Sequence, residues 1–280
     1  MNWTTARRQL TLDRPLVMGI LNVTPDSFSD GGQHLSIEAA LDRAEEMIGE
    51  GADIIDIGGE STRPGSSRIS AAQEIARIVP VIEGIAAKHP QTTISIDTTK
   101  SQVAYAAVQA GAGIINDISG LRWDPAIADV AAEGGAGLIL MHSRGDFETM
   151  HSQPPVDDIL QEVTRGLRSS IAVARQHGVT DEQICLDIGI GFSKTLTQNL
   201  ELIAQLDKIV AEFADYPLLV GASRKSFIGK LLGGVPVGQR LGGSIATGLM
   251  AVQKGARILR VHDVRDTVQA ITASGAIERV

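Results

Sequence analysis

Eight short apolar segments recur along the chain, and nearly all of them end in polar or charged residues. They occupy residues 17–22, 52–58, 92–97, 113–117, 137–142, 184–187, 217–221 and 257–262. Short runs rich in Ile, Val and Leu, separated by segments with helical periodicity, are typical of buried parallel strands. Eight such strand–helix units predict an α/β fold, a TIM (β/α)8 barrel that occupies residues 1–280 as a single domain.

The polar residues that end these segments are predicted to form one site. Parallel strands that close into a barrel present all their carboxyl ends on the same face. The residues expected to converge there are Asn22, Asp56, Asp97, Asn116, His142, Asp187, Lys225 and His262. His142 and His151 have no zinc-ligand spacing, so they are interpreted as loop or core-edge residues.

The composition narrows the class of protein and the partners to be expected. The formal net charge of -8 leaves no broad basic surface, so neither nucleic acid nor a membrane is an expected partner. The single cysteine, Cys185, lies inside an apolar segment, where a buried apolar role is favoured over a reactive thiol. No apolar run approaches the roughly 18 residues needed to span a bilayer, and a cytoplasmic protein is expected.

The segments between the predicted strands have the pattern of amphipathic helices. Residues 36–51 place their apolar positions on one face, and residues 197–214 are predicted to form one continuous helix. Another helix is predicted to begin at Ser70, with Gln73 completing a capping box. Three longer polar connections, at 23–35, 59–69 and 143–156, are candidate lids over the carboxyl face.

Carboxylate and amide side chains at three strand ends indicate what the site binds. Asp97, Asn116 and Asp187 combine groups that accept with one that also donates, which suits a nitrogen heterocycle. Asp97 is predicted to point into the barrel mouth. Because side chains alternate along a strand, it shares a face with Ser95, two residues earlier. The alternative for each is a helix-cap or turn role, and the same holds for Asp117.

Cationic residues cluster at strand ends in an acidic protein, which indicates a phosphate or diphosphate ligand. They are Arg63, Arg224, Lys225, Arg260 and His262, and the last two are expected to point into the mouth together as two potential cations. The alternative is salt bridges to Asp56, Glu60, Asp97 and Asp187, and both can hold at once.

Two glycine-containing segments near these cations are weighed as motifs. Residues 223–233 read as the start of a helix with Ser223 near its cap, where an anion could dock. Lys225 as a Schiff-base lysine is a less favoured alternative. Residues 189–194 lack the third glycine of a dinucleotide fingerprint, and residues 221–226 have the wrong spacing for a phosphate-binding Walker motif.

The chain resembles the dihydropteroate synthases from end to end. The matching segments are 18–32, 51–65, 95–100, 114–120, 221–229 and 260–264. The resemblance implies a TIM barrel, usually a homodimer, that acts in folate biosynthesis. The family joins a dihydropterin carrying a hydroxymethyl diphosphate to 4-aminobenzoate, releasing diphosphate and 7,8-dihydropteroate, and sulfonamides compete with the aminobenzoate.

The resemblance also assigns roles to individual residues. Pterin binding is implied for Asp97, Asn116, Asp187, Lys225 and Arg260. Diphosphate binding is implied for Asn22, Thr62, Arg63, Arg260 and His262, with Asn22 as the Mg²⁺ ligand. Phe28, Pro64, Phe192, Ser223 and Lys225 are implied to border the aminobenzoate pocket. The catalytic set is then Arg63, Lys225, Arg260 and His262, while Trp123, Ile188 and Ser193 depart from the family's usual pattern.

This chemistry implies a dissociative mechanism in which diphosphate leaves before the arylamine attacks. The two glycine-rich loops are expected to close when substrate is present and to exclude water. Three other functions remain open from the sequence: a pterin-dependent methyltransferase, a non-catalytic pterin-binding paralogue, and a phosphate-binding aldolase that uses Lys225.

Overall fold

The fold is a closed barrel of eight parallel strands, as the sequence predicts. The computed structural model describes residues 1–24, 33–63 and 65–277. Around the barrel, the strands follow the order β10-β3-β4-β5-β6-β7-β8-β9, and every pair is parallel. They are β3 (Leu16–Asn22), β4 (Ile54–Gly58), β5 (Thr93–Asp97), β6 (Ile114–Asp117), β7 (Gly137–Met141), β8 (Ile184–Asp187), β9 (Leu218–Val220) and β10 (Ile258–Val261). Each predicted apolar segment coincides with one of them, and β3 begins one residue earlier than predicted, at Leu16.

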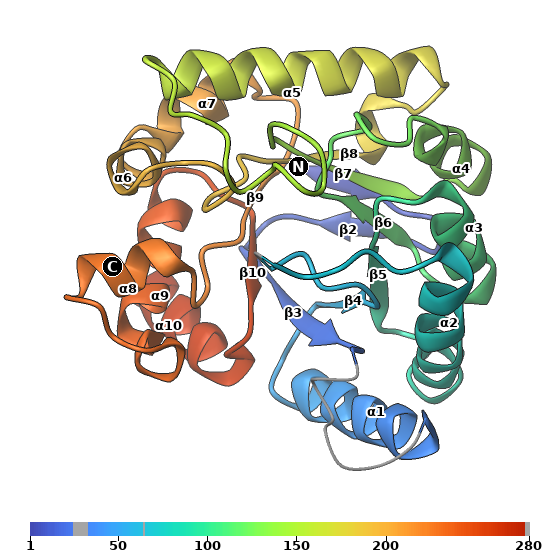
Figure 1. The fold of residues 1–280 in the computed structure, drawn as a ribbon. Coiled ribbons are helices and arrows are strands. Elements are labelled where there is room, and N and C mark those ends of the chain that lie inside the picture. The colour runs from blue at the N-terminus through green and yellow to red at the C-terminus, as the bar shows by residue number, and fades with distance from the viewer. Residues whose placement is uncertain (25–32, 64, 278–280) are drawn as a thin grey trace.

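Helices surround the barrel as an outer ring (Figure 1). They are α1 (Gln33–Gly49), α2 (Ala71–Lys88), α3 (Ser101–Ala110), α4 (Ala126–Gly134), α5 (Ile159–Gln176), α6 (Leu196–Ala204), α7 (Leu206–Glu212), α8 (Ser226–Leu231), α9 (Leu241–Gln253) and α10 (Val264–Ile277). The capping box predicted from Ser70 and Gln73 is present at the start of α2. The continuous helix predicted for 197–214 is wrong, because the chain breaks at Gln205 into α6 and α7.

The barrel interior has an apolar layer and a polar layer. The apolar layer contains Leu16, Met18, Ile54, Ile114, Ile139, Cys185, Leu219 and Ile258, all buried. Because side chains alternate along a strand, the residue two positions later points to the same side. That residue is Asp56 on β4, Asn116 on β6, Asp187 on β8 and Arg260 on β10. The polar layer therefore lies at the carboxyl ends of the strands.

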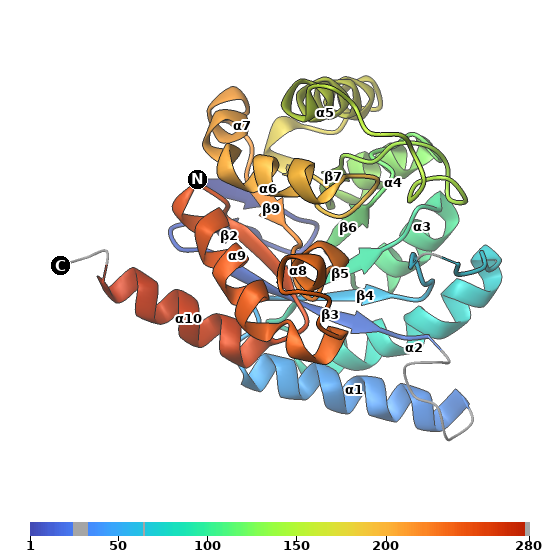
Figure 2. The same cartoon turned by 60° about the vertical axis from the view of Figure 1, so that its left-hand side comes forward.

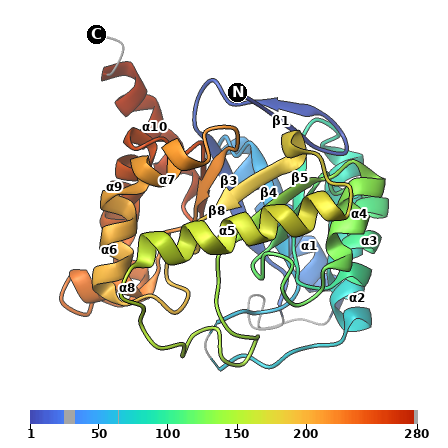
Figure 3. The same cartoon turned by 90° about the horizontal axis from the view of Figure 1, so that it is seen from above.

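A short hairpin closes the opposite end of the barrel. Strands β1 (Asn2–Thr4) and β2 (Gln9–Thr11) pair antiparallel, and Trp3 is completely buried against the apolar layer. Trp3 Nε1 donates a hydrogen bond of 2.8 Å to the carbonyl oxygen of Gln183. Figure 3 shows the hairpin on one side of the barrel and the connections that follow β4 and β7 on the other. The hairpin thus covers the amino end of the barrel, and the polar layer lies at the carboxyl end.

Candidate active site

The centre of the carboxyl face is a buried ion-pair network around Arg260. The Nε atom of Arg260 donates to Asp56 Oδ2 and its Nη2 atom donates to Asp97 Oδ2, both at 2.6 Å. Burial opposes the charge on Arg260, but the carboxylates of Asp56 and Asp97 outweigh it and raise the pKa of the guanidinium. Burial raises the pKa of Asp97 to about 7, while Arg260 holds it down. This guanidinium is held by two carboxylates and is 20% exposed, so it is available to contact a ligand as well.

Amide and carboxylate groups complete a polar ring at this level. Asn116 Nδ2 donates to Asp56 Oδ2 at 3.2 Å, and Asn116 is the register partner of Asp97. Asp187 accepts a 2.8 Å bond from Gly189 N, and burial raises its pKa while Lys225 lowers it. Among the described residues, Asp56 Oδ1 and Ser95 Oγ are buried without a hydrogen-bond partner. Such atoms are normally satisfied by water or ligand, so the ring suits a polar heterocycle.

The alternative roles can now be separated for the two aspartates on β5 and β6. Asp97 pairs with Arg260, and the first amide of α3 donates to Asp124 rather than to Asp97. Asp117 instead accepts from Ser119 N at 2.8 Å and Leu121 N at 2.6 Å, which is the turn role considered from the sequence. Burial raises the pKa of Asp117 to about 6. Asp97 therefore belongs to the site, whereas Asp117 shapes the turn beyond it.

Lys225 and Phe192 lie next to each other at the edge of the ring. Lys225 Nζ donates to the carbonyl oxygen of Ile190 and lies 4.5 Å from the centre of the Phe192 ring. Burial lowers the pKa of Lys225 to about 8, although Asp187 raises it. Gly191 allows this approach, because it has φ 86° and a Cβ there would lie 2.8 Å from Lys225 Cδ. Lys225 and Phe192, which the sequence assigns to the same pocket, thus place a cationic group beside an apolar ring.

His262 differs from its prediction as a second cation. Burial, and then Arg224 and Arg260, lower the pKa of His262 to about 4. Ser223 Oγ accepts from His262 N at 3.2 Å and lies 3.1 Å from His262 Nδ1. When the Ser223 hydroxyl donates to Nδ1, the proton of the neutral ring is on Nε2. His262 consequently offers a hydrogen-bond donor rather than a positive charge.

Ser223 also differs from its predicted place near a helix cap. Helix α8 begins at Ser226 after Lys225, and the Ser223 hydroxyl faces His262 instead. The neighbouring Arg224 donates to Asp263 Oδ2 at 3.0 Å, so it belongs to a salt bridge at the rim. The chain here is turned by the positive φ of Arg224, 58°, which separates the directions of the adjacent side chains.

The segment 59–69 carries the remaining predicted diphosphate residues. Arg63 is exposed, and its charge contributes to lowering the pKa of His262. The carbonyl oxygen of Thr62 accepts from His151 Nε2 at 2.7 Å. Glu60, a proposed partner for the site cations, pairs instead with Lys100 at 2.9 Å. Phe28 and Pro64 lie outside the described residues.

Comparison with known proteins places this geometry in a family. Residues 18–262 match the family model described as "Pterin binding enzyme". A dihydropteroate synthase of Escherichia coli K12 is 48% identical over 264 residues, covering 94% of this chain and 91% of that protein. The chain belongs to the dihydropteroate synthase family of pterin-binding enzymes.

Solved structures of the dihydropteroate synthase family superpose over the full chain. One from Xanthomonas albilineans with 4-aminobenzoic acid is 44% identical, covers 100% of both chains and has a TM-score of 0.92. Another from the same organism, in complex with 7,8-dihydropteroate, is 38% identical, covers 99% of both chains and has a TM-score of 0.86. The fold is therefore shared with solved structures whose names include 4-aminobenzoic acid and 7,8-dihydropteroate.

Two residues that depart from the family's usual pattern flank the loop that carries Phe192. Ile188 is completely buried in the core. Ser193 has φ 48°, a conformation that glycine adopts at low cost. The Ser193 hydroxyl donates to the carbonyl oxygen of Met150 and accepts from Gln153 N. These two hydrogen bonds stabilise the left-handed backbone of Ser193, which costs free energy for any residue other than glycine.

Lys194 also shapes the site, and the sequence pattern does not predict this role. Its Nζ atom donates to the carbonyl oxygens of Gly189 at 2.7 Å and Phe192 at 3.3 Å, closing the loop like a bound cation. Burial, and then the charge of Lys225, lower its pKa to about 7. The available signal in the sequence is the lysine that closes the glycine-containing segment 189–194.

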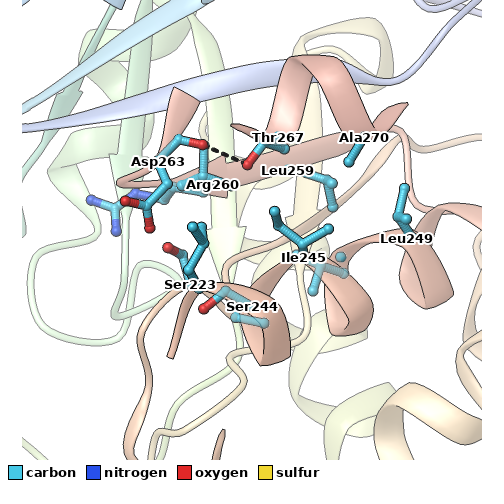
Figure 4. Close-up of a pocket in the computed structure, with 14 residues that line it drawn as sticks. Ser223, Ser244, Ile245, Leu249, Leu259, Arg260, Asp263, Thr267 and Ala270 are labelled. Atoms are coloured by element: carbon cyan, nitrogen blue, oxygen red, sulfur yellow. Dashed lines mark hydrogen bonds between the residues drawn. The ribbon is translucent and has the colours of Figure 1, made fainter. Parts of the chain in front are cut away.

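A small apolar pocket lies beside the site, between β10, α9 and α10 (Figure 4). Ile245, Leu249, Leu259 and Ala270 line one end, and Ser223 and Asp263 border the other. Its free volume of about 20 Å³ holds a single water molecule. It is therefore too small for either substrate of the family, and the barrel mouth remains the candidate active site.

Proposed function

We propose that this protein is a dihydropteroate synthase, which condenses (7,8-dihydropterin-6-yl)methyl diphosphate with 4-aminobenzoate to give 7,8-dihydropteroate and diphosphate. The observation that carries the proposal is the Arg260 network with Asp56 and Asp97, set beside Asn116 and Asp187 in the polar layer. It places hydrogen-bond donors and acceptors around the guanidinium of Arg260. This arrangement suits a site that binds and covers a pterin ring. The relatives are named for the same reaction.

The proposed chemistry is dissociative. The C–O bond between the pterin methylene and the diphosphate breaks, and diphosphate leaves with the electron pair. The dihydropterin ring delocalises the methylene cation, and the carboxylates of Asp97 and Asp187 stabilise it electrostatically. The arylamine nitrogen then forms the C–N bond and loses a proton. Arg63 and the Nε2–H of His262 are assigned to the departing diphosphate, and Lys225 and Phe192 to the aminobenzoate.

A magnesium ion is proposed to accompany the diphosphate. No group of three or more His, Cys, Asp or Glu side chains able to hold a metal occurs in the described part of the chain. Mg²⁺ often takes only one or two protein ligands plus phosphate oxygens and water, so a single amide oxygen fits. Asn22 Oδ1 is that oxygen, and it faces the space that a Cβ at Gly58 would enter, 3.7 Å away. When bound there, Mg²⁺ supplies charge neutralisation for the leaving group.

A Schiff-base aldolase is the second candidate, because buried Lys225 has a pKa lowered to about 8. Its ammonium group is nevertheless engaged by the carbonyl oxygen of Ile190 and lies beside Asp187. We expect borohydride in the presence of aldehyde substrates to leave Lys225 unmodified. Covalent trapping at Lys225 detected by mass spectrometry would favour the aldolase.

The decisive experiment measures diphosphate release from dihydropterin diphosphate with and without magnesium and 4-aminobenzoate. Release that requires both, together with dihydropteroate detected by chromatography, supports the synthase. Tight pterin binding without turnover identifies a non-catalytic paralogue. Release without incorporation of the arylamine contradicts the proposed acceptor.

The proposal includes a homodimer and a cytoplasmic location. Leu241 and Met250 on α9, with Leu231, Leu232 and Val237 before it, are exposed apolar side chains. Figure 2 shows α8, α9 and α10 on the same side of the barrel. Exposed apolar side chains of this kind are typical of a protein interface, and a second copy of the chain is the proposed occupant. The double variant Leu241→Glu/Met250→Glu should be monomeric in light scattering, whereas Tyr105→Glu on α3, also exposed, should leave the mass unchanged. Cell fractionation tests the location. In the described residues, no helix is long and apolar enough to cross a membrane.

A further inference from the structure

His151, in the connection 143–156, contacts two parts of the site that serve different substrates in the proposed function. Its ring stacks on Phe192 with centroids 5.4 Å apart and planes inclined by 23°. Its Nε2 atom lies 2.7 Å from the carbonyl oxygen of Thr62. A carbonyl oxygen only accepts, so Nε2 carries a proton and donates. Both the neutral ring with this proton and the imidazolium can make the bond.

The backbone on either side of His151 is fixed to the loop that carries Phe192. Met150 is buried, and its carbonyl oxygen accepts from the hydroxyl of Ser193. Gln153 N donates to the same hydroxyl at 3.2 Å, and Arg144 Nη2 donates to the carbonyl oxygen of Ser193 at 2.8 Å. The backbone of His151 is therefore tied to the loop that carries Phe192. From this loop, the His151 ring extends to the segment 59–69.

A second contact holds the segment 59–69 against the same loops. The guanidinium of Arg68 lies 5.1 Å from the centre of the Phe147 ring and 5.6 Å from that of Trp123. A cation–π contact requires only that the cation lie over the face of the ring. The His151 hydrogen bond is the directional contact, since it ends on the backbone of Thr62 directly before Arg63.

We propose that His151 is a positioning residue that couples the diphosphate side of the site to the aminobenzoate pocket. The inference rests on the proposed function, because Thr62 and Arg63 are assigned to diphosphate and Phe192 to the arylamine. A ligand that orders Thr62 and Arg63 fixes the His151 ring, and the stacked ring fixes Phe192. The free-energy cost of ordering the aminobenzoate pocket is then lower when diphosphate is already bound. The coupling is reciprocal by thermodynamic linkage.

Calorimetry with 4-aminobenzoate, with and without magnesium and inorganic diphosphate, tests this proposal. For the wild type we expect diphosphate to lower the Kd of 4-aminobenzoate at least about fivefold, at the lower end of typical couplings. In His151→Ala the factor should fall below about twofold, and diphosphate binding should lose the same coupling. A side chain with only a structural role would weaken each ligand alone and leave the ratio of Kd values unchanged. An unchanged ratio overturns the proposal.

Two further variants sharpen the outcome. His151→Phe keeps a ring to stack on Phe192 but has no donor for Thr62, so it should lose most of the coupling; full coupling in this variant overturns the proposal. His177→Ala is the matched control, because His177 pairs with Asp129 at the end of α5 and should keep the wild-type ratio. Turnover of the wild type decides the proposed function separately, since the binding ratio is measured without any reaction. A wild type with no coupling also overturns the inference.

Discussion

The two ends of the barrel are both buried, but their side chains have opposite chemistry. At the amino end, Trp3 and Leu12 pack on an apolar layer, and the one polar atom of the Trp3 side chain has its hydrogen bond. At the carboxyl end, Asp56 and Asp97 share Arg260, and burial shifts the pKa values of several groups. Burying charges costs free energy unless they are paired, whereas burying apolar area is favourable. One end therefore stabilises the barrel and the other holds the reactive polar groups in place.

The largest effect should follow from removing the shared cation. Arg260→Met leaves Asp56 and Asp97 buried without their partner, and loss of one partner of a buried pair costs about 3 to 5 kcal/mol of unfolding free energy. Turnover should fall by about three orders of magnitude or more, as for the loss of a central electrostatic group. Urea unfolding and the diphosphate assay measure the two effects. Arg257→Met, an exposed change three residues earlier, is the control, and equal loss in both variants would contradict the assignment.

The opposite end should respond in stability without loss of chemistry. Trp3→Ala removes the largest side chain of the hairpin from the apolar layer and should cost about 3 to 5 kcal/mol. Because Trp3 lies at the far end of the barrel from the polar layer, kcat below the melting transition should stay within about twofold. Thermal unfolding and steady-state kinetics provide the measurements, with exposed Gln9→Ala as the control. A large fall in kcat would show that the two ends are not independent.

Within the carboxyl end, two residues should separate turnover from binding. His262→Ala removes a donor assigned to the leaving group, so kcat should fall about a hundredfold while pterin affinity changes little. Asp187→Asn removes a carboxylate assigned to the ring and should chiefly weaken pterin binding. Steady-state kinetics combined with equilibrium pterin binding distinguishes them. A reversed pattern would exchange the roles given to these residues.

The titrating groups give the carboxyl end a pH response that the amino end lacks. Burial raises the pKa of Asp97 to about 7 and lowers that of Lys225 to about 8. With Asp97 needed as the carboxylate and Lys225 as the ammonium, kcat/KM should fall below pH 7 and above pH 8, about tenfold per pH unit in each limb. Asp97→Asn should remove the acid limb and Lys225→Met the alkaline limb from the residual activity. Trp3→Ala should retain the wild-type profile.

The smallest effect is expected in the apolar layer itself. Cys185 is completely buried, and burial raises its pKa well above the ordinary thiol value. A thiol-reactive dye should therefore label the native protein very slowly, and rapidly in denaturant. Faster labelling of Trp3→Ala would report opening at the amino end. Rapid labelling of the native wild type would contradict the burial of Cys185.

The barrel and its polar layer were predictable because both depend on local alternation. Ile54 and Asp56, or Cys185 and Asp187, are two apart on one strand, so their shared direction follows from the period of a strand. The hairpin was not predictable in this way, because strands of three residues show no period and the burial of Trp3 depends on residues far along the chain. The break at Gln205 was equally hidden, since apolar residues on both sides of it are buried as in one helix.

The charges within the site were only partly predictable. The strand pattern predicts that His262 and Lys225 lie at the carboxyl face, but their protonation depends on how many neighbours exclude water. The neutral state of His262 follows from its burial and from two nearby arginines. Lys194 gained its role from carbonyl oxygens of its own loop, which a residue pattern does not reveal. The directions of side chains follow from sequence, whereas their electrostatics require the packed fold.

The hairpin also has a consequence for how the protein is made. Trp3 and its acceptor on Gln183 are 180 positions apart. At ribosomal rates of about 5 to 20 residues per second, Trp3 waits roughly 10 to 35 s before that acceptor is even synthesised. Trp3 therefore completes this contact only long after its own synthesis. Until then this tryptophan is an exposed apolar group on a nascent chain, of the kind that chaperones bind.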